Sequence, residues 1–339
     1  MTKHIFQSSL QRYLPLALAL FGAAAPVLAA GDAKPFLGNF ALTIPGGGAG
    51  WLGITETDGK LAGKILWGGG SVLPVSSVSV DGDSLVVTRV NDSKKKDATG
   101  KTVVTRETET IKAKLDGDKL ALTTERERDG KVGGKATFTG QRIPPVGPAP
   151  DLAKVKFADP IKLFNGTDLS GWKTMGAPSG WGVKDGLMVN DAPQEPGKHK
   201  SYANIRTEKE FEDFNLTLEF RVPKGGNSGV YLRGIYEIQV ADSFGAKNDP
   251  HNCGALYSRI LPAENASKPA GEWQTYDITL VDRHVTVILN GKKVIDNQAV
   301  LGCTGGALWS DEFRPGPLYL QGDHTSVEYR NIMLRPVVK

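Results

Sequence analysis

Apolar and polar residues alternate with a period of two over most of the chain, which is the pattern of β-strands that bury one face. The segment Phe214–Val222 shows it most clearly, because every second residue is apolar and each residue between them is polar. Long runs with the 3.6-residue period of an amphipathic helix are hard to find. The 41 glycines and 20 prolines supply turns. The chain is therefore predicted to be all-β.

Residues 36–142 are predicted to form a small all-β domain, a β-meander with a barrel-like arrangement. Short alternating runs follow one another at regular spacing, and Asp-Gly turn dipeptides separate several of them. The segment Asp92–Gly100, which contains Lys94–Lys96, is predicted to be a solvated hairpin tip. The predicted strands are Asn39–Ile44, Trp51–Thr55, Leu61–Leu66, Val72–Val80, Ser84–Val90, Thr102–Leu115, Lys119–Glu125 and Ala136–Gly140.

A proline-rich segment separates this domain from a second one. Ile143–Ala153 contains four prolines, which cannot continue a strand ladder, so residues 143–155 are predicted to be a linker. Residues 156–339 then contain about ten further strand patterns, which favours a two-sheet sandwich of jelly-roll type. The strands predicted there are Trp181–Val183, Gly186–Val189, Phe214–Val222, Val230–Leu232, Tyr236–Val240, Trp273–Val281, His284–Leu289, Lys292–Ile295, Leu318–Gln321 and Val327–Arg335.

Residues 1–30 have the pattern of a signal peptide. Basic residues precede the apolar run Leu14–Phe21, and small residues follow as far as Ala30. The apolar run is too short to span a bilayer, and no cysteine lies at the cleavage site to carry a lipid. We therefore expect a cleaved signal peptide and a periplasmic or secreted protein without a membrane span.

Charge and cysteine content narrow the picture further. The formal net charge of +4 comes from 41 basic and 37 acidic residues, and this mild balance does not favour nucleic-acid binding. The only cysteines are Cys253 and Cys303. In an oxidising compartment they are predicted to form a disulfide that closes a loop of about 50 residues and contributes about 4 kcal/mol. The alternative is a pair of free, buried thiols.

The stretch Gly225–Phe244 carries the most suggestive polar residues. Alternation along Tyr236–Val240 places Glu237 and Gln239 on one face of a strand, away from the apolar side chains. A β-bulge after Val240 would bring Asp242 onto the same face. Two carboxylates and an amide in one row suit proton transfer or the binding of sugar hydroxyls. The alternative is an ordinary solvated sheet face.

Several motifs in the second domain occur together in a fixed order. They are Leu163-Phe164-Asn165-Gly166, Gly226-Asn227-Ser228-Gly229-Val230, Tyr236-Glu237-Ile238-Gln239-Val240, Asn265-Ala266-Ser267-Lys268-Pro269, Gly271-Glu272-Trp273 and Leu320-Gln321-Gly322-Asp323-His324. On these residues the segment 158–336 resembles a bacterial family of 3-keto-disaccharide hydrolases. The resemblance implies a concanavalin A-like β-sandwich and action on glycosides oxidised at C3.

A ketone at C3 acidifies the proton at C2, so the implied reaction needs a base, a group that stabilises the enolate, and an acid for the leaving oxygen. As a hypothesis, the catalytic groups are Glu237, His324, Lys268 and Asp242, and Arg233, Gln239, Tyr257 and Gln321 bind substrate. No cofactor is required by the sequence. A divalent metal between Glu237, Asp242 and His324 is an open alternative, because carboxylates and imidazoles suit several ions.

The same fold class includes laminarinase-type glucanases, which carry Glu-x-Asp-x-x-Glu on one strand. Here the corresponding run has Gln239 in place of the middle acid and the shorter Asp242 as the last one, so the glucanase mechanism is not transferred. Two other classes of function stay open. One is a non-catalytic, lectin-like glycan-binding module on the same sandwich, and the other is a structural two-domain β protein.

Overall fold

The computed structural model describes residues 31–96, 99–195 and 197–338. The predicted signal peptide at residues 1–30 lies outside this range. The described residues are almost entirely β, and their one helix is the short 3₁₀ turn η1 (Lys34–Phe36). None of the helices in this part of the chain is long and apolar enough to cross a membrane. The all-β prediction is confirmed.

The first domain is one antiparallel sheet of nine strands in the order β4-β3-β2-β1-β9-β8-β7-β6-β5. The sheet is open, because its edge strands β4 and β5 do not pair with each other, so the barrel-like part of the prediction is corrected. The edge strand β4 has only two residues, and one of them is Pro74, which has no N–H for a ladder. The strands are β1 (Gly38–Thr43), β2 (Ala49–Thr57), β3 (Lys60–Trp67), β4 (Leu73–Pro74), β5 (Ser77–Asp81), β6 (Ser84–Lys96), β7 (Thr102–Asp116), β8 (Lys119–Arg128) and β9 (Lys131–Ile143).

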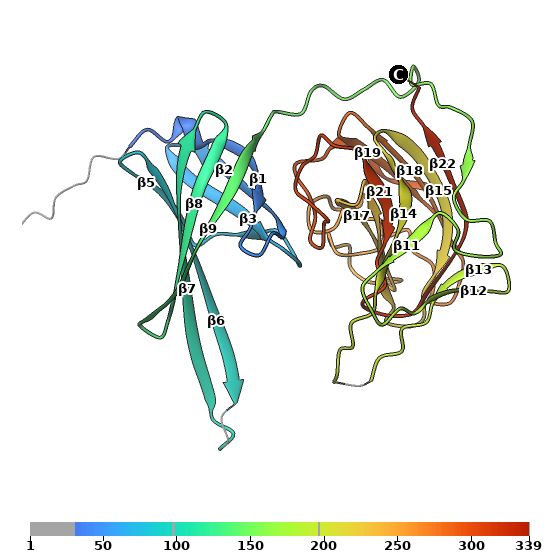
Figure 1. Ribbon diagram of the computed structural model, residues 1–339, viewed down its shortest axis with the longest axis horizontal. Coiled ribbons are helices and arrows are strands. Elements are labelled where there is room, and N and C mark those ends of the chain that lie inside the picture. Colours follow the sequence, from blue (N-terminus) through green and yellow to red (C-terminus); the bar gives the residue numbers. More distant parts are fainter. Residues whose placement is uncertain (1–30, 97–98, 196, 339) are drawn as a thin grey trace, which may run out of the picture.

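The hairpin of β6 and β7 is longer than its hydrophobic pattern predicts. Strand β6 continues to Lys96, through most of the segment predicted as a solvated tip, and the two strands project from the domain as an arm (Figure 1). The arm carries cross-strand ion pairs instead of apolar contacts, such as Arg106 with Asp92 at 2.8 Å. Backbone pairing therefore extends beyond the part of the hairpin that covers a core.

The second domain is a sandwich of two sheets. The larger sheet runs β12-β13-β22-β15-β18-β19-β20 with β10 beside β22, and the smaller runs β11-β14-β21-β16-β17. Figure 1 shows the two sheets facing each other. The strands are β10 (Ile161–Lys162), β11 (Trp172–Met175), β12 (Trp181–Lys184), β13 (Leu187–Asn190), β14 (Asn204–Phe211), β15 (Phe214–Arg221), β16 (Asn227–Leu232), β17 (Tyr236–Ala241), β18 (Gln274–Val281), β19 (His284–Leu289), β20 (Lys292–Ala299), β21 (Gly316–Leu320) and β22 (Val327–Pro336).

Apolar side chains at alternating positions of the strands fill the space between the two sheets. The apolar residues of β15, from Phe214 to Phe220, are buried in one cluster with Val230 and Ile238 of the smaller sheet. Because side chains alternate across a strand, the residues between these apolar positions must point to the outer face of each sheet. The outer face of the smaller sheet is where Glu237 and Gln239, two of the polar residues predicted from Gly225–Phe244, lie.

The two domains are in contact beyond the linker. Trp51 of β2 belongs to the buried cluster of the sandwich, and the guanidinium of Arg259 lies 4.5 Å from its ring centroid. The carbonyl of Pro144 in the linker accepts a hydrogen bond from Arg283. The first domain therefore packs directly against the second.

The predicted disulfide is absent from the structure, where Cys253 and Cys303 are both free and buried. The Cys253 thiol lies 3.3 Å from the Tyr276 hydroxyl, and the Cys303 thiol faces the carbonyl of Gly50 in the first domain at 3.8 Å. Burial raises the pKa of Cys253 to about 11 and that of Cys303 to about 12. Each cysteine fills a separate buried position, so the disulfide prediction is corrected.

Candidate functional site

A row of polar side chains crosses the outer face of the five-stranded sheet. Strand pairing sets Glu237 of β17 opposite Tyr231 of β16, and Tyr231 opposite Tyr319 of β21. The same row continues to Arg206 of β14 and Lys173 of β11. The rings of the two tyrosines stack, with centroids 4.3 Å apart. Five neighbouring strands therefore place an acid, two phenols and two cations side by side on one face.

A second row beside the first contains two amides and a glycine. Gln239 lies opposite Gly229, whose carbonyl accepts a hydrogen bond from the Gln321 backbone N–H. The Oε1 atoms of Gln239 and Gln321 are buried and have no hydrogen-bond partner in the described structure. A Cβ at position 229 would lie 2.3 Å from Glu237 Oε1, so only glycine leaves room for this carboxyl. Buried polar atoms without partners mark a surface prepared for a ligand or for water.

Glu237 is almost completely buried, with 3% of its surface exposed. Burial raises its pKa to about 8, and the negative charge of Asp323 adds to this effect. Within the described residues, no cation lies at ion-pair distance from its carboxyl. Glu237 is therefore mostly protonated at pH 7, and it titrates close to neutral pH.

The Tyr231 hydroxyl shows where the protons of this pair lie. It is 2.9 Å from Glu237 Oε2 and 2.7 Å from the carbonyl oxygen of Gly305. A phenol carries one proton, and a carbonyl oxygen can only accept. When Tyr231 donates to Gly305, the Glu237 carboxyl can fill the remaining contact only by donating its own proton. A proton donated by Tyr231 to Glu237 would lower the pKa of the carboxyl, but burial outweighs this contact, and the net raised pKa makes the neutral carboxylic acid the main form at pH 7.

The first domain reaches one edge of this face. The segment after β17 returns beside it, so that Tyr257 pairs with Glu237 through its backbone N–H, and the ring of His251 meets that of Tyr257 edge to face. His251 Nε2 lies 2.9 Å from the hydroxyl of Ser71. A Cβ on Gly305 would lie 2.1 Å from the carbonyl oxygen of Gly70, so the loop that receives the Tyr231 proton is pressed against the first domain.

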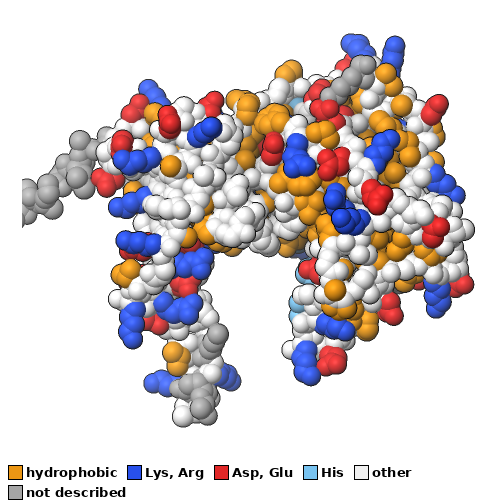
Figure 2. Space-filling view, viewed as in Figure 1, with side chains coloured by type: hydrophobic (Ala, Val, Ile, Leu, Met, Phe, Trp, Pro, Cys, Tyr) orange, Lys and Arg blue, Asp and Glu red, His pale blue; other side chains and the backbone are white. Residues whose placement is uncertain are grey.

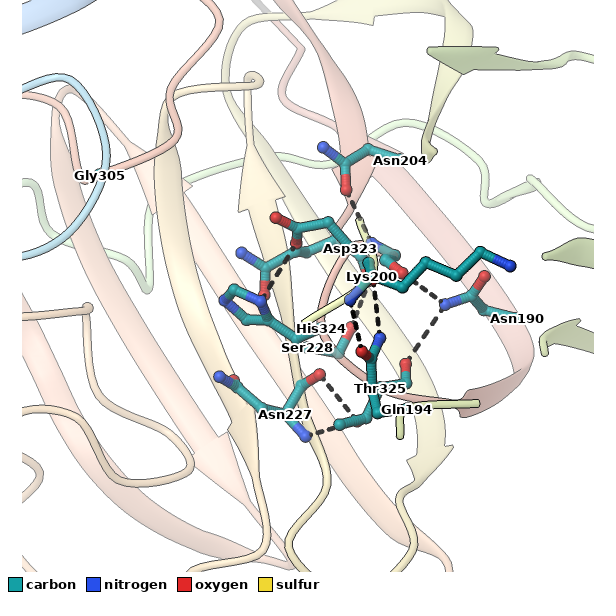
Figure 3. A network of polar contacts seen from close by, with 12 residues as sticks. Asn190, Gln194, Lys200, Asn204, Asn227, Ser228, Gly305, Asp323, His324 and Thr325 are labelled. Atoms are coloured by element: carbon teal, nitrogen blue, oxygen red, sulfur yellow. Dashed lines mark hydrogen bonds and ion pairs between the residues drawn. The ribbon is translucent and has the colours of Figure 1, made fainter. Parts of the chain in front are cut away.

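Three titratable side chains meet at another edge of the face, where β21 ends. Asp323 Oδ1 is 3.7 Å from His324 Nδ1, and the ring centroids of His324 and His199 are 5.6 Å apart. Figure 3 shows Asp323 and His324 joined by a dashed line among polar side chains from the ends of β14, β16 and the loop after β13. One ligand atom from each of His199, Asp323 and His324 lies within 4.8 Å of the others. Within the described residues, His199, Asp323 and His324 bring their donor atoms close enough to hold a metal ion, a group different from the predicted alternative of Glu237, Asp242 and His324.

The structure brings five of the predicted site residues to this face and its edges. Glu237, Gln239 and Gln321 lie in the two rows, and Tyr257 and His324 lie at their edges.

Asp242 does not join the row, because β17 pairs with β16 in continuous register and contains no bulge. Its carboxylate instead accepts a hydrogen bond from the N–H of Gly225 at 2.9 Å. The predicted bulge is corrected.

Arg233 and Lys268 lie elsewhere. The Arg233 side chain is buried and donates to the carbonyls of Glu312 and Arg314, which fixes the loop before β21. The Lys268 ammonium donates to the carbonyl of Trp273, and its charge acts on Glu219 of the larger sheet. Both cations therefore hold backbone and neighbouring strands in place, and neither adjoins Glu237.

Sequence reasoning missed Tyr231, Asp323 and His199. Tyr231 follows Gly229 by two residues, so alternation alone places it on the same face as the glycine. Asp323 directly precedes the predicted His324, which was the signal for it. His199 comes from a loop more than one hundred residues away in sequence, and no spacing could have paired it with His324.

Residues 159–335, slightly more than half of the chain, match the family model of the 3-keto-alpha-glucoside-1,2-lyase-like domain. A 3-keto-disaccharide hydrolase of Bacteroides thetaiotaomicron is 26% identical over 166 residues, which span 40% of this chain and 57% of that protein.

Solved structures give similar relatives for the sandwich. A protein of Parabacteroides distasonis named as a glycosyl hydrolase is 30% identical, covers 56% of this chain and 93% of its own, and has a TM-score of 0.43. A carbohydrate-binding module of Bacillus subtilis is 12% identical, with a TM-score of 0.33, and covers 48% of this chain and 94% of its own. The family-model match places the chain, through its second domain, in the family of the 3-keto-alpha-glucoside-1,2-lyase-like domain.

Proposed function

We propose that the polar face of the smaller sheet binds a glycoside carrying a ketone at C3 and cleaves its glycosidic bond. Three things support this: the family to which the sandwich belongs, a relative named as a 3-keto-disaccharide hydrolase, and the buried Glu237 that titrates near neutral pH. The last observation carries the proposal, because it supplies a group suited to exchange a proton with a sugar.

The chemistry of such a substrate differs from that of an ordinary glycoside. A C3 ketone makes the C2 proton acidic, and its removal gives an enolate whose negative charge rests on the C3 oxygen. The enolate re-forms the ketone by expelling the C1 substituent, which takes up a proton, and water then adds across the resulting double bond. No nucleophile has to attack C1, so the pair of carboxyls needed by a retaining glycosidase is not required.

Glu237 is the group that takes the C2 proton. A carboxylate with a pKa of about 8 is a much stronger base than one at 4.5, and at pH 7 roughly a tenth of the molecules hold it in the basic form. Tyr231 assists, because its single proton can turn from the Gly305 carbonyl toward Glu237 when the carboxylate forms. Burial thus strengthens the base, and the phenol stabilises its charged form.

The amides of the second row serve binding. Gln239 donates to the Oδ1 of Asn227 at 3.3 Å, which leaves its own Oε1 free to accept from a hydroxyl. The free Oε1 of Gln321, the residue directly after β21, offers a second acceptor. Sugar hydroxyls would satisfy both atoms, and a site built to pair them rejects ligands that lack those hydroxyls.

The test is proton exchange at C2 in deuterated water, followed by NMR. A disaccharide oxidised at C3 and its unoxidised parent are incubated with the full chain, with Glu237→Gln, and with Glu328→Gln as a control at a half-exposed, ion-paired carboxylate of the larger sheet. We expect exchange and cleavage of the oxidised sugar only, lost in Glu237→Gln and kept in the control.

Three other outcomes have clear meanings. Equal cleavage of the parent sugar would contradict the requirement for the ketone, and full activity of Glu237→Gln would contradict the assigned base. Sugar binding without turnover, measured by calorimetry on the same samples, would favour the glycan-binding module, to which the unpaired amides would then belong.

A further inference from the structure

The edge of the polar face that carries His199, Asp323 and His324 offers a set of metal ligands. The three donor atoms lie within 4.8 Å of one another, and the Asp323 Oδ1 and His324 Nδ1 atoms are 3.7 Å apart. An ion bound at about 2.1 Å keeps adjacent ligand atoms about 3–4 Å apart, so only a small closure of the exposed His199 is needed. His199 lies in the loop after β13, which projects from the molecule on the same side as the β6–β7 arm (Figure 2).

A second observation points to a ligand at this place. Asp323 Oδ1 is buried and has no hydrogen-bond partner in the described part of the chain, although its residue is polar and otherwise partly exposed. The Oε1 of Gln321, two residues earlier, is also buried and unpartnered. Unpaired buried oxygens are costly, and a bound cation would satisfy the carboxylate directly.

The two imidazoles have no stronger partner than this carboxylate. His199 and His324 face each other with their ring planes at 61°, and among the described residues the one charged group at ion-pair distance from the His324 ring is Asp323. The exposed His251 on the other edge differs, because its Nδ1 is 2.6 Å from Asp249 and its Nε2 is 2.9 Å from Ser71. Both nitrogens of His251 are thus engaged, whereas the paired histidines keep nitrogen atoms available.

We propose that His199, Asp323 and His324 bind one divalent transition-metal ion at the edge of the Glu237 face. Two imidazoles and one carboxylate suit Mn²⁺, Co²⁺ or Zn²⁺ better than Mg²⁺ or Ca²⁺, which prefer oxygen ligands throughout. Three protein ligands leave coordination positions open to water or substrate. In the proposed reaction such an ion would stabilise the charge that develops on the C3 oxygen. This role rests on the proposed function, but the binding itself does not.

Cobalt binding tests the site without any substrate. The full chain without an affinity tag is titrated with Co²⁺, and the visible absorption of imidazole-bound cobalt is followed together with calorimetry. Wild type is expected to bind one ion per chain. His199→Ala and Asp323→Asn should each weaken binding at least tenfold, whereas His251→Ala, a matched exposed histidine that also contacts an aspartate, should leave it unchanged.

Thermal unfolding of each variant in the absence of metal verifies that the fold is intact. Absence of stoichiometric binding by wild type, or equal binding by wild type and His199→Ala, would overturn the metal site. The two proposals can be contradicted separately. Turnover that persists in a metal-free protein would exclude only the proposed role of the metal in the reaction. Cobalt binding with no action on any C3-oxidised sugar leaves the metal site standing and removes the function.

Discussion

Glu237 and Glu312 are both buried glutamates of the sandwich, and each contacts a tyrosine hydroxyl, but their surroundings give them different properties. Glu312 is 2.7 Å from the Tyr236 hydroxyl, accepts the Gly302 N–H at 3.0 Å and pairs with Arg283 at 3.1 Å. Burial raises its pKa, and Arg283 opposes this most strongly. Glu237 meets a tyrosine whose proton has a second acceptor and, as its charged neighbour, the negative Asp323.

The difference shows that burial alone does not make a carboxyl reactive. Glu312 has hydrogen-bond donors for both oxygens and a cation, so its charge is compensated and it joins the loop before β21 to the rest of the domain. Glu237 has the Tyr231 hydroxyl but, among the described residues, no cation, so burial dominates and the carboxyl is mostly protonated at neutral pH. The contacts of Glu312 are those of a structural residue, whereas those of Glu237 leave it able to exchange a proton.

The largest difference that we predict between Glu237 and Glu312 is in turnover. Glu237→Gln keeps the shape of the side chain but cannot take a proton, so cleavage of a C3-oxidised disaccharide should fall by about 10⁴-fold. Glu312→Gln should keep nearly full turnover per folded molecule, because the Glu312 carboxylate contacts Tyr236, Gly302 and Arg283, none of which belongs to the two polar rows. Steady-state rates of both variants at 20 °C measure the difference, and a similar loss in both would erase the proposed contrast.

The next largest effect is the pH dependence of the free energy of unfolding. The pKa of Glu237 rises from 4.5 in the unfolded chain to about 8 in the folded protein, so the folded state holds this proton more tightly. The contribution of this proton to the free energy of unfolding is full below pH 4.5 and is lost as the pH rises to about 8. The change is about 5 kcal/mol, at 1.36 kcal/mol per pKa unit. Urea unfolding at pH 5, 7 and 9 should show wild type losing stability relative to Glu237→Gln. A constant difference between the two proteins would mean that the folded state does not raise this pKa.

Loss of the Glu312 charge should affect folding rather than catalysis. In Glu312→Gln the buried Arg283 loses its ion-pair partner, and an uncompensated buried charge costs about 3–5 kcal/mol. The free energy of unfolding measured with urea at pH 7 should fall by that amount, whereas Glu237→Gln at the same pH should raise it by about 3 kcal/mol, because wild type has by then lost most of the stability that its raised Glu237 pKa removes between pH 4.5 and 8. Equal stabilities for the two variants would show that Arg283 finds another partner.

The smallest effect concerns the cysteines. Since Cys253 and Cys303 are free and lie in separate buried positions, a reductant should leave the melting temperature unchanged. Both thiols should react with Ellman's reagent only after unfolding in the absence of reductant, because burial raises the pKa of each. Failure of the unfolded, unreduced chain to react would restore the predicted disulfide.

The period-two alternation determined most of the fold. Strands such as β15 and β17 were predicted within a few residues, because each buries one face and the pattern records which one. The hairpin arm, the open sheet of the first domain and the split of Val72–Val80 into β4 and β5 were not predicted. These features depend on cross-strand pairing and edge geometry, which a single strand's hydrophobic pattern does not contain.

For the candidate site, too, the sequence predicted one part and only the tertiary structure decided the other. Alternation alone placed Glu237 and Gln239 on a polar face, and the order of the motifs indicated the family. Only the tertiary structure joined His199 to His324, set Tyr231 between Glu237 and Gly305, and moved Arg233 and Lys268 away to structural positions. The physical reason is that a local sequence fixes which face a side chain occupies, whereas its partners come from distant segments that meet only when the sheets pair and pack.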